Sequence, residues 1–247
     1  MKDIHNHLLY SIDDGSNSLN DSIEILNDLY NRGVTDIVLT PHYIIGTDYN
    51  SSNKEKLKLI KELEKNTKIK LYMGNEVFID NNILEYIENS EISTINSSRY
   101  LLIELPLEEK LESSNNIIFK LRNSGIIPII AHPERYSYLS IKDLEELINE
   151  GCLFQGNISS LIDKYGKKAR KNLELLLKKH MIHVLGTDIH NHTFDLNICK
   201  EKLSTIVDKD MYNELLCKNF DKIVNNKDIE VYEILKVGTF FKREKIR

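Results

Sequence analysis

The sequence predicts an α/β fold, a seven-stranded (β/α) barrel with C-terminal helices, and three observations carry this prediction. Seven short, β-rich apolar runs recur along the 247 residues. Helical patterns separate most of these runs, and regular alternation of this kind is typical of βαβ units in a parallel sheet. Most runs are apolar throughout, as strands buried on both faces are. Seven units fit a barrel better than two open sheets, although periodicity alone does not separate the two.

The strands are expected where these apolar runs lie. They cover residues 3–7, 36–40, 69–73, 100–104, 126–131, 152–157 and 182–186. The ten glycines and four prolines fall singly, and no repeat, low-complexity tract or linker interrupts the pattern. We therefore expect residues 1–247 to form a single domain.

The first helix has the clearest boundaries. Ser18 can cap its amino end, with Asp21 three residues later as an approximate capping box. Gly33 suits the left-handed position that follows the carboxyl end. The apolar stripe of this helix comprises Ile23, Leu26, Leu29 and Tyr30. Further helices are expected at residues 54–66, 81–88, 114–123, 141–150, 167–179 and 196–207, and after residue 208 one or two helices cover the barrel before a basic tail.

The composition excludes several classes of protein. The chain has 33 Lys and Arg against 38 Asp and Glu, and its net charge of −5 argues against a general binder of nucleic acid or of anionic membranes. No stretch approaches the ~20 consecutive apolar residues of a membrane span. The first residues carry acids and histidines where a signal peptide needs an apolar stretch. Three scattered cysteines form neither a disulfide framework nor a zinc knuckle. We expect a cytoplasmic enzyme or binding protein.

Potential metal ligands follow the predicted strands. In a parallel barrel, functional groups gather at the carboxyl ends of the strands. His5 and His7 are two residues apart, so a strand directs both imidazoles to one face. The nine potential ligands are His5, His7, Asp14, His42, Glu76, Glu104, His132, Asp188 and His190. This set offers nitrogen and oxygen without thiolate, which suits Mn²⁺, Fe or Zn²⁺. Nine ligands exceed the needs of one ion, so we expect two or three metals.

The same segments resemble a known superfamily. In chain order the sequence has HNH, DDG, TPHY, GNEVF, ELP, AHPERY and GTDIHN. This ordered set is similar to the motifs of the polymerase-and-histidinol-phosphatase (PHP) superfamily. Within it, the sequence most resembles the manganese-dependent protein-tyrosine-phosphatase branch found with capsular and exopolysaccharide loci. The resemblance runs from Met1 to about Asp228, and it implies a distorted seven-stranded barrel that holds a trinuclear metal centre.

The resemblance also implies how nine ligands share three metals. By this analogy one metal is held by His5, His7, Glu76 and Asp188, a second by Glu76, Glu104 and His132, and the third by Asp14, His42 and His190. Arg135 matches the family's phosphate-binding arginine, and a guanidinium can hold two phosphate oxygens at once. The chain departs from the family at Asp195, where arginine is common, and at Ser16, where proline is usual. His192 lies near enough in sequence to replace that arginine in part.

These residues suggest the hydrolysis of a phosphomonoester. In this hypothesis two metals bind the phosphate oxygens, a metal-bound hydroxide attacks phosphorus in line, and Arg135 stabilises the transferring group. A phenolate leaving group, with a pKa of about 10, needs little acid assistance, and His42 or metal-bound water are the candidates for it. A cysteine phosphatase needs an arginine six residues after its nucleophilic cysteine. The residues at this distance from Cys152, Cys199 and Cys217 are isoleucine, threonine and isoleucine, so this chemistry is absent.

Three functions remain in view. The preferred one is a metal-dependent protein-tyrosine phosphatase acting on an autophosphorylated tyrosine kinase of polysaccharide export. A phosphatase for a small molecule such as histidinol phosphate is the first alternative, and a non-catalytic binding or regulatory module is the second.

Several polar residues near the predicted metal ligands have structural interpretations instead. Asp13 is read as a turn or cap residue, Asn157 as an orienting residue or an ordinary loop residue, and His180 and His183 as structural.

Overall fold

The computed structural model describes residues 1–191 and 194–235. Its strands are β1 (Lys2–Asp3), β2 (Asp36–Leu39), β3 (His42–Tyr43), β4 (Lys70–Met73), β5 (Glu76–Phe78), β6 (Tyr100–Glu104), β7 (Ile127–Ala131), β8 (Leu153–Asn157) and β9 (Val184–Gly186). Its helices are α1 (Leu19–Asn31), α2 (Asn53–Leu63), α3 (Ile83–Glu88), α4 (Ser114–Asn123), α5 (Ile141–Asn149), α6 (Gly166–Lys178), α7 (Leu196–Ile206), α8 (Lys209–Asn213) and α9 (Asn219–Val224). No helix of these two ranges is long and apolar enough to cross a membrane.

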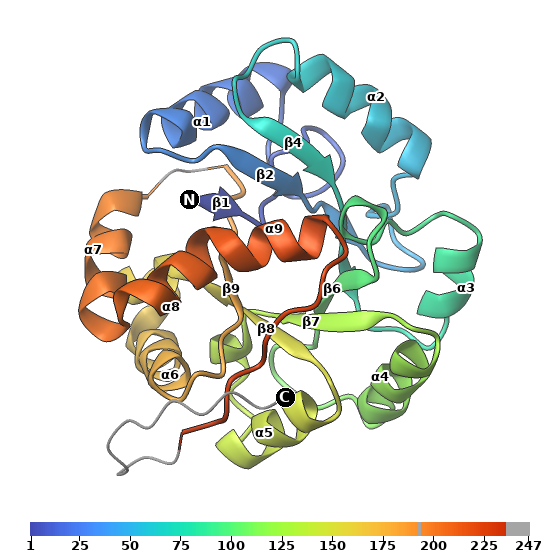
Figure 1. Cartoon of the computed structure of the whole chain (residues 1–247). Coiled ribbons are helices and arrows are strands. Elements are labelled where there is room, and N and C mark those ends of the chain that lie inside the picture. The colour runs from blue at the N-terminus through green and yellow to red at the C-terminus, as the bar shows by residue number, and fades with distance from the viewer. Residues whose placement is uncertain (192–193, 236–247) are drawn as a thin grey trace.

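The strands form a curled parallel sheet surrounded by helices, as the sequence predicts (Figure 1). Hydrogen bonds link them in the orders β1-β2-β4 and β3-β5-β6-β7-β8-β9, and every strand pair is parallel. The segment after β1 joins the two sheets, because His7 N donates to Ile189 O at 2.8 Å and Asp188 N donates to His5 O at 2.8 Å. The predicted α/β barrel is therefore confirmed.

Two predicted strands are each followed, after a break, by a second short strand that was not predicted. His42 and Glu76 were expected just beyond the strands at residues 36–40 and 69–73, yet they begin β3 and β5, which pair with each other. Pro41 lacks an N–H and ends the β2 ladder. Gly74 allows close packing at the second break, because a Cβ there would lie 2.9 Å from Val38 Cγ1. After the breaks the two segments pair again in the same register, since Leu39 pairs with Met73 before them and His42 pairs with Glu76 after them, so His42 and Glu76 lie side by side.

The first strand is shorter than predicted. It was expected over residues 3–7, but β1 ends at Asp3. Beyond it the chain separates from β2, and Thr40 N donates to Asn6 O at 3.1 Å while the Asn6 side chain donates to Val38 O at 2.9 Å. This separation gives the residues around Asn6 room to contact Ile189 on the other side.

The boundaries of α1 are confirmed, but its buried face is rotated from the predicted stripe. Ser18 caps the helix and accepts a hydrogen bond from Asp21 N at 3.2 Å, and Gly33 has a φ of +82°. The buried apolar side chains are Ile25, Leu26 and Leu29. Tyr30 is instead 39% exposed, and its ring packs against the Lys68 ammonium 5.5 Å away.

Apolar side chains fill two regions of the barrel. The inner cluster includes Ile4, which follows β1, and the strand residues Val38, Leu102, Ile129, Leu153 and Val184. Phe220, Ile223 and Val224 of α9 close this cluster at the amino ends of the strands. Helix α9 crosses the mouth at the amino ends of the strands (Figure 1), so the predicted covering helices are confirmed. His183 lies at this end, where its Nδ1 accepts from Phe154 N at 3.0 Å, in agreement with a structural role.

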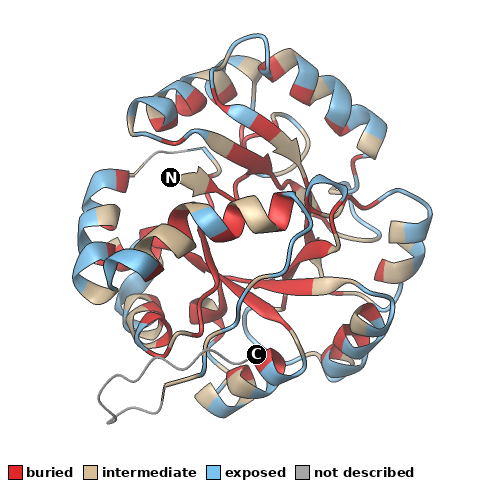
Figure 2. Ribbon diagram, in the orientation of Figure 1, coloured by how far each residue is buried: buried red, intermediate tan, exposed pale blue. Residues whose placement is uncertain are grey.

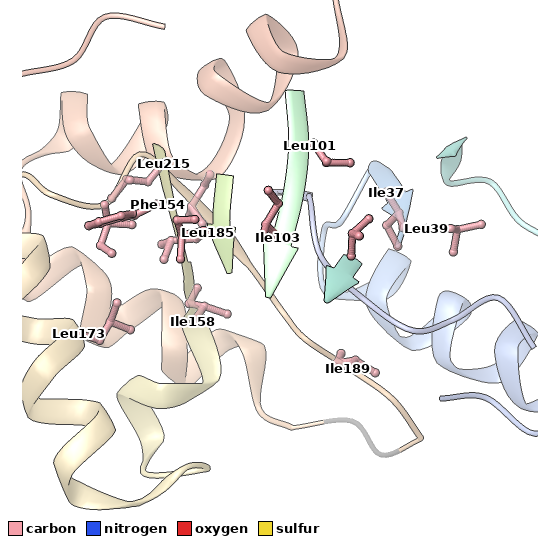
Figure 3. Packing of buried hydrophobic residues seen from close by; sticks show 14 of the residues in the cluster. Ile37, Leu39, Leu101, Ile103, Phe154, Ile158, Leu173, Leu185, Ile189 and Leu215 are labelled. Atoms are coloured by element: carbon pink, nitrogen blue, oxygen red, sulfur yellow. The ribbon is translucent and has the colours of Figure 1, made fainter. Parts of the chain in front are cut away.

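The outer cluster fills the space between the strands and the surrounding helices. Figure 2 shows buried residues along the strands and exposed residues on the outer faces of the helices. Leu173 of α6 lies near Phe154 of β8 and Leu185 of β9, as Figure 3 shows. A Cβ on Gly156 would lie 2.7 Å from Leu173 Cδ1, so this glycine lets α6 pack closely on the sheet. The packed wall holds the carboxyl ends of the strands in fixed positions.

Candidate metal centre

All nine predicted ligands lie in one cluster at the carboxyl end of the barrel. Their side chains come from the segment after β1, its following loop, β3, β5, β6 and the segments after β7 and β9. His5, His7, Glu76, His132 and Asp188 are buried, whereas His42, Glu104 and His190 are partly exposed. Asp14 is half exposed at the edge of the cluster. Their assignment as metal ligands stays a prediction.

The deepest part of the cluster joins His5, His7, Glu76 and Asp188. Glu76 Oε2 lies 3.1 Å from His5 Nε2 and 3.2 Å from His7 Nε2. The two imidazole Nε2 atoms are 3.2 Å apart. Asp188 Oδ1 lies 3.6 Å from His5 Nε2 and 3.5 Å from His7 Nε2. Four donor atoms thus surround one point, in the group that the resemblance assigns to the first metal.

The second group shares Glu76 with the first. Its other oxygen, Oε1, lies 3.2 Å from His132 Nε2. Glu104 Oε1 lies 3.6 Å from the same nitrogen, and Glu104 Oε2 lies 3.9 Å from His42 Nδ1. Because the two oxygens of Glu76 face different groups, this carboxylate can bridge two cations.

The third group lies nearest the solvent. Asp14 Oδ1 lies 3.6 Å from His42 Nε2 and 3.4 Å from His190 Nε2. His7 and His190 stack with ring centroids 3.9 Å apart. His42 also approaches the deeper groups, since its Nδ1 lies 3.2 Å from Glu76 Oε2. The three groups are therefore contiguous rather than separate sites.

A set of polar side chains orients the deepest ligands from behind. Asp13 Oδ2 lies 2.8 Å from His7 Nδ1, so the ionised carboxylate accepts from this nitrogen and leaves the Nε2 lone pair facing the cluster. Gln155 donates from Nε2 to Asn157 Oδ1 at 2.9 Å, so its Oε1 accepts from His5 Nδ1 at 2.7 Å. The turn expected at Asp13 is present, because its Oδ1 accepts from Gly15 N. Its contact with His7 was not predicted.

Asp188 is oriented in the same way. Its Oδ2 accepts from Asn157 Nδ2 at 2.6 Å, from Tyr165 OH at 2.8 Å and from Arg135 Nη1 at 3.3 Å. Its Oδ1 then faces the histidines alone. The orienting role considered for Asn157 is therefore present in the structure. Asp188 also has a φ of +50°, a strained backbone conformation for a residue other than glycine.

The electrostatics of the cluster favour a bound cation. The outer hydrogen bonds turn the Nε2 atoms of His5 and His7 toward each other and toward a carboxylate. Burial lowers the pKa of His5, but the charges of Glu76 and Asp188 outweigh burial and raise it to about 9, so a positive charge is favoured at this position. Burial and the charge of Glu76 raise the pKa of Glu104 to about 8. A metal ion between these groups would take the place of the imidazole protons and offset the repulsion between the carboxylates, so the donor set fits metal ions.

A pocket of about 740 Å³ opens above the cluster. Seven of the nine metal-ligand candidates form its floor, all except His5 and His7, and one wall is apolar. That wall includes Ile44, Tyr49, Phe78, Pro106 and Leu107. The ring of Tyr49 stacks on His42 with centroids 6.0 Å apart. The pocket therefore combines a polar floor with a surface suited to a flat hydrophobic group.

Arg135 faces this pocket, and its ion-pair partner is Asp188 rather than its sequence neighbour Glu134. The Arg135 guanidinium contacts Asp188 and lies 4.4 Å from the centroid of the Tyr165 ring. Glu134 is buried and accepts hydrogen bonds from Asn157 N and Ser160 Oγ. The sequence analysis missed Tyr165 and its neighbour Lys164, which also line the pocket.

Asp195, where the resemblance led us to expect arginine, lies outside the pocket lining. It caps α7, where its carboxylate accepts from Asn197 N and Ile198 N. Its Oδ1 lies 3.6 Å from Arg32 Nη1 at the surface. A helix cap thus explains why an acid suits this position. His192, considered above as a partial replacement, lies outside the described residues.

Comparison with known proteins identifies the family. A model described as capsular polysaccharide synthesis, CpsB/CapC, matches residues 1–225. CapC of Staphylococcus aureus is 40% identical over 238 residues, which cover 93% of each chain. The tyrosine-protein phosphatase CpsB of Streptococcus pneumoniae is 34% identical over 203 residues, 77% of this chain and 83% of that protein. The tyrosine-protein phosphatase YwqE of Bacillus subtilis is 27% identical over 241 residues, 93% of both.

Solved structures agree with these relatives. A crystal structure from a study of YwqE from Bacillus subtilis and CpsB from Streptococcus pneumoniae, described there as unique metal-dependent tyrosine phosphatases, has a TM-score of 0.85 and 25% identity. It covers 96% of this chain and 100% of its own. The phosphotriesterase homology protein from Escherichia coli, at a TM-score of 0.59 and 12% identity over 90% of this chain and 98% of its own, shares the fold alone. These matches confirm the resemblance, and the chain belongs to the CpsB/CapC family.

Proposed function

We propose that this protein is a metal-dependent tyrosine-protein phosphatase, which hydrolyses the phosphomonoester of phosphotyrosine. The observation that carries the proposal is the convergence of nine side chains with nitrogen or oxygen donors in one cluster, seven of which line the floor of a pocket with an apolar wall. The floor suits a phosphate group bound through cations, and the wall suits the phenol ring. The activity named for its relatives CpsB and YwqE supports the same function.

We propose Mn²⁺ as the cofactor, in two or three ions per chain, with Fe or Zn²⁺ as alternatives. The three groups of donors described above would hold these ions, with Glu76 shared between two of them. When bound, the ions supply positive charge to the phosphate oxygens and make a water molecule a stronger nucleophile. The 3.2 Å approach of the His5 and His7 Nε2 atoms beside Glu76 Oε2 supports this assignment, because one cation can be bound by all three atoms.

The chain's own residues complete the proposed chemistry. Arg135 would bind phosphate oxygens through its planar guanidinium and stabilise the charge on the transferring group. The ring of Tyr165, 4.4 Å from the guanidinium carbon, holds Arg135 at the edge of the floor. His42 is the candidate for holding a proton near the leaving phenolate, which needs little assistance because the pKa of phenol is about 10.

The two alternative functions fit less well. A phosphatase for histidinol phosphate would place a polar imidazole ring and an ammonium group near Phe78 and Leu107, whereas these apolar side chains suit a phenol ring better. A non-catalytic binding module would not need nine donors in contiguous groups. We further propose that the substrate is an autophosphorylated tyrosine kinase of capsular or exopolysaccharide synthesis, that both act in the cytoplasm, and that residues 1–247 are one domain.

The proposed substrate class is tested by comparing kcat/KM for a phosphotyrosine peptide and for histidinol phosphate with added Mn²⁺. We expect a preference of at least about tenfold for the peptide, the effect of one good apolar contact. Phe78→Ala should reduce this preference. Phe119→Ala is the matched control, because Phe119 is 62% exposed on α4 and lies outside the pocket lining. A preference for histidinol phosphate would overturn the proposal.

A further inference from the structure

We propose that Lys164 binds the substrate phosphate together with Arg135, as the second cation of the pocket. This inference rests on the proposed function. Among the described residues that line the pocket, Lys164 is the only lysine and Arg135 the only arginine, whereas six of the lining residues carry carboxylates. The carboxylates are those of Asp14, Glu76, Glu104, Glu108, Glu109 and Asp188. A phosphate dianion entering this acidic surrounding therefore depends on the metal ions and on two side-chain cations.

The two cations converge on one ligand candidate from different elements. Lys164 follows the 3₁₀ turn Ile158–Ile162 after β8, and its Nζ donates to Asp188 O at 3.3 Å. Arg135, in the 3₁₀ turn after β7, donates to Asp188 Oδ2 at 3.3 Å. Both positive charges thus lie beside Asp188, which is itself a metal-ligand candidate. A phosphate bound at the cluster near Asp188 lies within reach of both.

Aromatic rings hold these cations without neutralising them. The Tyr165 ring centroid lies 5.3 Å from Lys164 Nζ and 4.4 Å from Arg135 Cζ. The centroid of the Phe194 ring lies 5.4 Å from Lys164 Nζ. Ring contacts of this kind orient a cation but leave its N–H donors free for an anion.

Lys164 also has unused capacity for an anion. Its described hydrogen bond goes to a neutral backbone carbonyl, and within residues 1–191 and 194–235 its ammonium forms no ion pair with a carboxylate at 4.0 Å or less. An ammonium carries three donors, so two remain. The side chain is exposed at the rim, where an incoming phosphate reaches it.

The test compares Lys164→Met, which removes the charge at similar length, with Lys164→Arg, which keeps it. Lys168→Met is the matched control, because Lys168 lies four residues later and lines a neighbouring hollow rather than this pocket. Calorimetry measures the Kd of inorganic phosphate for each Mn²⁺-loaded protein. Hydrolysis of p-nitrophenyl phosphate gives KM and kcat, and metal analysis gives the Mn²⁺ content.

We expect Lys164→Met to weaken phosphate binding and raise KM by about tenfold, the effect of one exposed charge-assisted hydrogen bond. Its kcat should change less than about threefold, its Mn²⁺ content should be unchanged, and Lys164→Arg should restore phosphate binding. Unchanged phosphate binding in Lys164→Met, or an equal loss in Lys168→Met, would overturn the inference. A loss accompanied by lower Mn²⁺ content would also overturn it, because Lys164 would then only position Asp188. If the wild type hydrolyses no aryl phosphate but Lys164→Met still weakens phosphate binding, the proposed function fails and this inference stands.

Discussion

Replacing Asp13 by asparagine should weaken metal binding although Asp13 is not a ligand candidate. Its buried carboxylate accepts three hydrogen bonds, from His7 Nδ1 at 2.8 Å, His42 N at 3.0 Å and Gly15 N at 3.0 Å. An asparagine has one oxygen and one NH₂ group in the same space. In either orientation of the amide, its NH₂ faces at least one of these donors.

The size of the effect follows from these contacts. With the amide oxygen toward His7, the lost bond is that of Gly15; with the NH₂ group toward His7, the imidazole loses the partner that fixes its tautomer. Changes to such orienting residues weaken metal affinity by about 10- to 100-fold, or about 1.4 to 2.8 kcal/mol. We therefore expect the Mn²⁺ concentration for half-maximal activity to rise by this factor, while kcat at saturating Mn²⁺ stays within about threefold.

The assay is a Mn²⁺ titration of p-nitrophenyl phosphate hydrolysis, supported by calorimetric Mn²⁺ binding. Asp195→Asn is the matched control, because this exposed acid caps α7 and asparagine caps helices equally well. The reasoning would be refuted by an Asp13→Asn variant that binds Mn²⁺ within about twofold of the wild type. An equal loss in Asp195→Asn would also refute it, since the effect would then not depend on contact with His7.

Three further predictions concern stability and metal dependence. Lys56 is fully buried and donates hydrogen bonds to Asn75 and Ser93, and burial lowers its pKa to about 7 from 10.5. Between these two pKa values the native chain binds fewer protons than the unfolded chain. The free energy of unfolding therefore rises with pH across this window. Lys56→Met should therefore flatten the pH dependence of urea unfolding between pH 7.5 and 9.5 by up to about 1.4 kcal/mol per pH unit; an unchanged slope would contradict this. Phe220→Ala should lower the free energy of unfolding by about 3–5 kcal/mol, because this fully buried ring closes the lower end of the barrel, and a loss under about 1 kcal/mol in urea unfolding would contradict that packing. Chelation of metal should lower the Tm in thermal unfolding and added Mn²⁺ should restore it, because a cation offsets the repulsion between Glu76 and Glu104; a Tm independent of Mn²⁺ would argue against the metal centre.

Much of the fold was predictable because its signals are local. Apolar runs and helix caps depend on neighbouring residues, and the predicted bounds of β6 (Tyr100–Glu104) and α4 (Ser114–Asn123) agree with the structure. The gathering of nine polar residues was predictable for a geometric reason, since the carboxyl ends of parallel strands share one edge of a barrel. The breaks before β3 and β5 were not, because they depend on how two distant runs pair after each bend.

The supporting side chains of the site were harder to predict. Gln155 contacts His5 across 150 residues of chain, and a glutamine in an apolar run carries no sequence signal for such a contact. Lys164 and Tyr165 follow a short turn, and only the folded chain brings them to Asp188. Asp13 gave a partial signal, since it directly precedes the ligand candidate Asp14, but its pattern is also that of an ordinary turn.

The central claim is that the nine donors bind the metal ions that enable phosphate hydrolysis. The most direct measurement is Mn²⁺-dependent hydrolysis of p-nitrophenyl phosphate by the wild type and by His132→Ala, with metal content determined on the same samples. His132 is buried, and its Nε2 lies 3.2 Å from Glu76 Oε1 and 3.6 Å from Glu104 Oε1. We predict at least two Mn²⁺ per wild-type chain, as in the proposed centre, and a loss of activity of about 100-fold or more with reduced metal content in the variant. Activity and metal content unaffected by the substitution would contradict the account.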